Sequence, residues 1–88
     1  MDEINLEEVW KQFFEEYIEL KKEYSLLLRT KAVEGLATIE IYQVTASEHK
    51  RIIKVEEETQ ENAFRAGIRE IARFKALQKH KREKEKQN

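Results

Sequence analysis

The chain has 88 residues, of which 40% are hydrophobic and 40% charged, with a formal net charge of −1 at pH 7. A chain of this length holds one small core, and a second subunit often supplies the buried surface that such a domain lacks. It contains no cysteine, which excludes disulfide bonds and thiolate metal sites and fits a reducing cytoplasm. Its apolar runs are too short for a signal peptide or a membrane span, so we expect one cytoplasmic domain over residues 1–88.

The charge is sorted along the chain, although the net charge is close to zero. Residues 1–28 contain eight acidic and three basic residues, whereas residues 60–88 contain nine basic and four acidic residues. A basic segment attracts polyanions or acidic surfaces that an acidic segment repels. The sorting therefore points to a class of partner, or to pairing between the two ends, without identifying a reaction.

Residues 5–34 are predicted to form one long helix. Asn5 and Glu8 have the spacing of a capping box, and Gly35 suits the left-handed residue that follows a helix. Apolar residues recur in this segment in steps of four and three, which places them on one stripe. The stripe consists of Leu6, Trp10, Phe13, Tyr17, Leu20, Tyr24 and Leu27. Such a stripe is typical both of a helix that covers the chain's own core and of a coiled-coil seam, and we expect it to support a homodimer.

After Gly35 the hydrophobic period changes from that of a helix to that of a strand. Alternating residues and β-branched side chains predict strands over residues 36–45 and 50–57, joined as a two-stranded antiparallel hairpin. The alternative interpretation takes Thr45 and Glu48 as a capping box that starts a second long helix, which would give an all-α helical hairpin. The polar stretch over residues 56–62 argues against that alternative, because it offers such a helix nothing to pack.

A final helix is predicted over residues 59–82, with Thr59 as its cap and a basic tail over residues 78–88. Small and apolar residues between Ala63 and Leu77 form the face expected to pack inward. The predicted fold is therefore α+β, in the order helix, strand, strand, helix.

Residues able to carry chemistry are few. His49 and His80 are far apart in the sequence and have no cysteine or second histidine nearby with which to build a metal or nucleophile site. The two glycines are isolated, so they do not make a phosphate-binding loop. We therefore expect no enzyme, cofactor or metal site.

The basic end offers a better functional signal. Arg65, Arg69 and Arg73 are spaced by four, which aligns three guanidinium groups on one helix face, and Lys79 and Arg82 extend the positive charge. Arginine forks match phosphate geometry, so this row is a candidate contact for phosphates or an acidic surface. The same bases could instead neutralise the acidic first helix. Most aromatic residues cluster in that acidic helix, which makes base stacking a poor interpretation.

Two functional hypotheses follow. The first is a non-enzymatic interaction module, an adaptor, assembly factor or inhibitor, that acts as a dimer through its first helix and binds a protein partner. The alternative is an accessory nucleic-acid-binding protein that uses the basic helix. A concentration-dependent dimer and salt-sensitive nucleic-acid binding are their respective tests.

Overall fold

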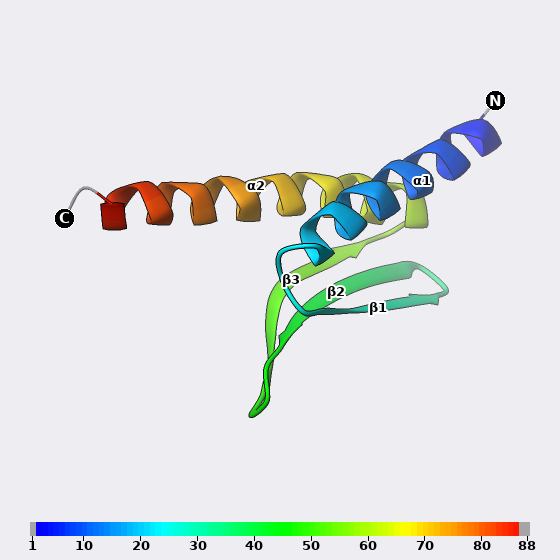
Figure 1. Cartoon of the computed structure of the whole chain (residues 1–88). Coiled ribbons are helices and arrows are strands. Elements are labelled where there is room, and N and C mark those ends of the chain that lie inside the picture. The colour runs from blue at the N-terminus through cyan, green and yellow to red at the C-terminus, as the bar shows by residue number, and fades with distance from the viewer. Residues whose placement is uncertain (1, 87–88) are drawn as a thin grey trace.

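The computed structural model describes the backbone of residues 2–86 and the side chains of residues 6–83. The elements are α1 (Asp2–Lys21), β1 (Leu26–Val33), β2 (Leu36–Val44), β3 (His49–Glu57) and α2 (Gln60–Lys86). The strands form an antiparallel sheet in the order β1-β2-β3, and both helices lie on one face of it (Figure 1). The predicted α+β class is confirmed, and the all-α alternative is wrong.

The first helix is shorter than predicted, because residues 26–33 form β1. α1 already contains Asn5, which was expected to cap its start, and it ends at Lys21, where the amides of Glu23 and Tyr24 donate to the carbonyl oxygen of Leu20 at 3.1 and 3.2 Å. Three consecutive leucines, residues 26–28, fit both the 3.6-residue repeat of a helix and the two-residue repeat of a strand. In the strand, Leu26 is buried and Leu27 points to the opposite face.

Gly35 closes a tight turn and does not end a helix. Val33 and Leu36 are the last pair between β1 and β2, and Gly35 between them has φ 78°. Helix C-caps and tight turns both require a left-handed residue, so glycine alone does not distinguish them. The predicted two-stranded hairpin is therefore corrected to a three-stranded meander.

The second hairpin agrees closely with its prediction over residues 36–45 and 50–57. Thr45 and Glu48, which resembled a capping box, close the turn instead, where the Glu48 amide donates to Thr45 Oγ1 at 3.1 Å. A bulge leaves Ile52 without a partner, because Ile41 pairs with Ile53 while Tyr42 pairs with Arg51. Ile52 packs against the core as a result.

The core lies between the sheet and the two helices. It contains Val9, Phe13, Tyr17 and Leu20 from α1, Leu26, Ala37, Ile39, Ile41, Ile53 and Val55 from the sheet, and Ala63, Phe64, Ala66 and Ile71 from α2. Gly67 permits the close approach of the helices, since a Cβ atom there would lie 2.7 Å from Phe13 Cε1. Small residues on α2 thus let both helices share one layer.

The last helix begins and continues much as predicted. The hydroxyl of Thr59 accepts a hydrogen bond from the Asn62 amide at 3.2 Å, which is the expected cap. α2 continues to Lys86, so the predicted basic tail is helical over its described part, while residues 87 and 88 lie outside the described residues. Its second half projects beyond the sheet (Figure 1).

Candidate functional site

The predicted stripe of α1 is divided between the core and the surface. Phe13, Tyr17 and Leu20 are at most 5% exposed, and Leu6 and Tyr24 pack partly buried against the same core. Burial raises the pKa of the Tyr17 phenol. Most side chains predicted for self-association are thus occupied by the chain's own core. The two exceptions are Trp10, which is 47% exposed, and Leu27, which belongs to β1.

Trp10 belongs to an aromatic row along one flank of α1. Its ring centroid lies 5.0 Å from that of Phe14, and Phe14 meets Tyr17 edge to face at 6.1 Å. This row connects an exposed tryptophan to the buried core, so the indole is held in place by packing and is not a free surface side chain.

A groove of about 190 Å³ opens beside Trp10. It is lined by α1, the last half of β1, the first half of β2 and the start of α2. We call it the Trp10 groove. Its lining residues are Trp10, Thr30, Lys31, Ala32, Ala37, Thr38, Ile39, Gln60, Ala63 and Phe64. Sites for drug-sized molecules measure roughly 300–1,000 Å³, so this groove suits anchoring side chains better than a whole small molecule.

One wall of the Trp10 groove is a strand with an open edge. β1 pairs with β2 only, and the Val44 amide donates to the Ser25 carbonyl oxygen at 2.9 Å. Because hydrogen-bonded pairs alternate in an antiparallel ladder, the backbone groups of Leu28, Thr30 and Ala32 point away from β2. The strand is exposed from residue 29 to residue 33. An edge of this kind can pair with another strand.

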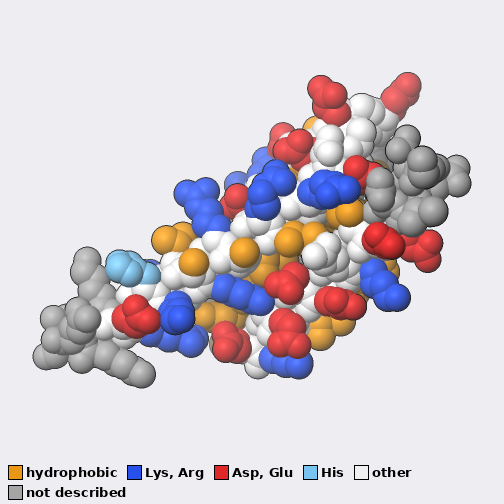
Figure 2. All heavy atoms as spheres, turned by 90° about the horizontal axis from the view of Figure 1, so that it is seen from above, with side chains coloured by type: hydrophobic (Ala, Val, Ile, Leu, Met, Phe, Trp, Pro, Cys, Tyr) orange, Lys and Arg blue, Asp and Glu red, His pale blue; other side chains and the backbone are white. Residues whose placement is uncertain are grey.

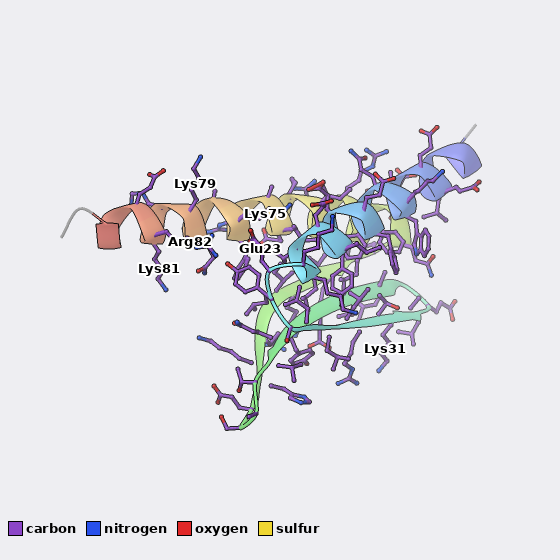
Figure 3. All side chains as sticks on the ribbon, in the orientation of Figure 1. Glu23, Lys31, Lys75, Lys79, Lys81 and Arg82 are labelled. Carbon is purple, nitrogen blue, oxygen red and sulfur yellow. The ribbon has the colours of Figure 1, made fainter. Side chains whose placement is uncertain are left out.

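The side of β1 that faces away from the helices is basic. Arg29 and Lys31 lie there, opposite Glu40 and Thr38 of β2, and Figure 3 shows Lys31 pointing away from both helices. The carboxylate of Glu40 accepts a hydrogen bond from Arg51 of β3, whose Nη1 lies 3.1 Å away. Among the described side chains, neither Arg29 nor Lys31 has a carboxylate oxygen within 4.0 Å.

The environment of Glu40 lowers the pKa of its carboxyl group. The hydrogen bond from Arg51 is the largest cause, the hydroxyl of Tyr42 donates a second at 3.1 Å, and the charges of Arg51 and Arg29 act in the same direction. Partial desolvation opposes these effects without reversing them. Glu40 is therefore ionised at neutral pH and engaged within the sheet.

The predicted basic row on α2 divides into two groups. Arg65, Arg69 and Arg73 lie on the solvent side, where Arg65 contacts Glu61 at 3.4 Å and Arg73 contacts Glu70 at 4.0 Å. These ion pairs stay within α2. Figure 2 accordingly shows basic and acidic side chains interspersed over the helices, without one large basic patch on this face.

Bases on the other flank of α2 meet α1 and the turn that follows it. Lys75 pairs with Glu16 at 3.4 Å, and Arg82 donates to the hydroxyl of Tyr24 at 3.3 Å. Lys79 lines a cleft together with Glu19, Glu23 and Tyr24. Within the described residues, the acidic and basic ends of the chain are thus joined by one ion pair between the helices, that of Lys75 with Glu16.

Other classes of site receive no support from the described residues. His49, at the start of β3, and His80, on α2, are both exposed, and no group of three metal-ligating side chains occurs within the described part of the chain. Neither α1 nor α2, as far as each is described, has an apolar stretch long enough to cross a membrane. No protein-family model, curated protein or solved structure matches the chain.

Sequence reasoning identified Trp10 but not the rest of its groove. Thr30 and Ala32 were assigned to a helix, and Phe64 was expected only as a core residue. The β-branched Thr30 and Val33, together with the glycine of the following turn, were the signal that indicated a strand.

Proposed function

We propose that this chain is a non-enzymatic interaction module, an adaptor, assembly factor or inhibitor, that binds a protein partner at the Trp10 groove. One observation carries the proposal: Trp10 is 47% exposed and packed in place beside a groove of mixed polar and apolar lining and an open strand edge. Tryptophan is enriched among the residues that dominate binding energy at protein interfaces. An indole that is packed in place beside a small groove and an open strand edge is arranged as such an anchor.

The test uses affinity capture from native cells with wild type, Trp10→Ala and Leu77→Ala. Leu77 is the control, because it is an apolar residue of α2 that is 56% exposed and does not line the groove. Partners captured by wild type and Leu77→Ala should be lost with Trp10→Ala, since removing an anchor of this kind costs at least about 2 kcal/mol, or roughly 30-fold in affinity. Equal capture by both variants, with circular dichroism confirming that both fold, would contradict the proposal.

Homodimerisation through α1 and a cytoplasmic location stay predictions. Since the stripe residues Phe13, Tyr17 and Leu20 are buried in the chain's own core, dimerisation would rely on the exposed flank that carries Trp10 and Ile18. A concentration-dependent dimer in light scattering that is lost in Ile18→Glu would support this mode. A monomer at all concentrations tested would remove it.

Nucleic-acid binding by α2 is the second candidate. It is favoured by the exposure of Arg65, Arg69 and Arg73 on the solvent side of a helix that projects beyond the sheet. Such binding should fall steeply with salt, because each phosphate contact releases counterions. We expect it to be lost in Arg69→Glu plus Arg73→Glu and retained in Arg29→Glu plus Lys31→Glu, which changes the charge equally on β1. Nuclease treatment during affinity capture separates this candidate from the first.

A further inference from the structure

We infer that the partner contributes an extended segment with alternating acidic and apolar residues, which adds to the free edge of β1 as a fourth strand. This inference rests on the proposed function and specifies the ligand class of the Trp10 groove. Backbone geometry, side-chain alternation and charge each support it.

The backbone supplies the first argument. Leu28, Thr30 and Ala32 direct their N–H and C=O groups to the free edge, at a spacing of two residues. An added strand satisfies these groups with a ladder that needs no particular side chain, and affinity then comes from main-chain hydrogen bonds. The exposed stretch of β1 is long enough for several such bonds.

The side chains on the helix side supply the second argument. Thr30 and Ala32 are small and stand opposite Ile39 and Ala37 on the inner face, so the space between β1 and Trp10 is left unfilled. Every second side chain of an added strand would point into this space. Ala37, Ile39 and Phe64 form the apolar part of its lining, beside polar residues such as Thr30 and Gln60. Inward side chains that reach this apolar part should be aliphatic or aromatic.

The outer face of β1 supplies the third argument. The remaining side chains of an added strand would lie beside Arg29 and Lys31, at the Cβ distances of about 4.5–5.5 Å typical of cross-strand pairs. Among the described side chains, neither cation has a carboxylate oxygen within 4.0 Å, although the charge of Arg29 acts on Glu40 opposite it. Glutamate or aspartate at these positions is therefore favoured, and lysine or arginine is disfavoured.

The same charges argue against a second copy of this chain as the occupant. A two-fold axis that joins two β1 edges runs perpendicular to the sheet, so outward residues face outward residues. If the axis passes at Thr30, Arg29 of one copy lies opposite Lys31 of the other. If it passes at Arg29 or at Lys31, that residue lies opposite the same residue of the other copy. Like charges in direct cross-strand pairs are destabilising. The charge pattern thus selects a different, acidic chain.

The test uses the full chain and a capped seven-residue peptide, Glu-Val-Glu-Leu-Glu-Val-Glu, with a lysine-for-glutamate version as its matched control. Trp10 is the only tryptophan, so its emission reports directly on the groove. We expect the acidic peptide to shift the emission to shorter wavelength and to bind at least about tenfold more tightly than the lysine peptide. Hydrogen exchange should slow at the amides of Leu28, Thr30 and Ala32.

Two variants with equal charge changes make the test specific. Arg29→Glu plus Lys31→Glu should reverse the preference between the two peptides, whereas Arg69→Glu plus Arg73→Glu should leave it unchanged. Equal binding of both peptides to wild type, protection at β3 in place of β1, or a dimer through β1 in ultracentrifugation would each overturn the inference. If neither peptide binds but Trp10→Ala still loses captured partners, the inference fails and the proposed function stands.

Discussion

The two outer strands of the sheet have opposite surroundings. On β3, Ile53 and Val55 are buried beneath the helices, whereas β1 is exposed from residue 29 to residue 33. The difference arises because α2 lies close over β2 and β3, while the Trp10 groove separates α1 from the end of β1. The helix-facing side of β3 therefore contributes to the core, whereas that of the last half of β1 is left uncovered.

The largest expected effect on stability comes from a valine-to-alanine substitution on β3, compared with the same substitution on β1. Val55→Ala on β3 should lower the free energy of unfolding by about 2 kcal/mol, because it removes two buried methyl groups from a side chain that is 5% exposed. Val33→Ala on β1 should change it by less than about 0.5 kcal/mol, since Val33 is 52% exposed. Urea denaturation measures both, and equal effects would remove the distinction between the strands.

Gly67→Ala tests the close packing on the covered side. The new Cβ would lie 2.7 and 2.9 Å from two ring atoms of Phe13, which is itself 1% exposed and closely packed. We expect a net loss of about 1–2 kcal/mol, because overpacking costs about 1–3 kcal/mol and the higher helix propensity of alanine offsets up to about 1 kcal/mol of it. Phe13→Leu in the same background should restore part of the loss in thermal denaturation. Wild-type stability of the single variant would show that the helices can separate cheaply.

Gly35→Ala tests the uncovered side, at the turn that leads from β1 to β2. No heavy atom lies within 4 Å of the position of a Cβ there, so the cost arises only from the positive φ of 78°. A loss of about 1 kcal/mol is expected. Because the cause is conformational, Gly35→Asn should be tolerated better than Gly35→Ala, whereas a steric cause would reverse that order.

Glu40→Gln should have the smallest effect, and one that depends on pH. Since Arg51 of β3 lowers the pKa of Glu40, the ionised carboxylate stabilises the fold above its ordinary pKa of 4.5. That stabilisation is lost as the pH falls through the lower pKa of the folded state. Wild type should therefore melt slightly above the variant at pH 7, and the gap should close in acid. A gap that widens below pH 4.5 would mean that the pKa is raised.

The sequence predicted the parts of the fold whose signals are local. Thr59 and the acidic run before it marked the start of the last helix, and the alternation from residue 36 onward marked two strands. The prediction failed over residues 26–33, because three consecutive leucines satisfy both the helical and the strand period. Pairing with β2 resolved that ambiguity, and pairing is a long-range contact.

The candidate site was predicted only in part for the same reason. Trp10 was identified by its helical spacing, but Phe13 and Tyr17 share that spacing and are buried. Thr30, Ala32 and Phe64 come from three distant parts of the chain and meet only when the sheet and helices pack. No periodicity within one segment indicates which side of an apolar face will be left uncovered.

Composition and local pattern determined that this chain forms α+β elements with a capped final helix, lacks thiol chemistry and separates acidic from basic residues. Those properties depend on residue type and on neighbours within a few positions. Tertiary structure alone decided that Gly35 turns a hairpin, that part of the charge pairs between the helices and that Trp10 stays exposed beside an open strand. These outcomes depend on which surfaces compete for burial, and that competition is settled across the whole fold.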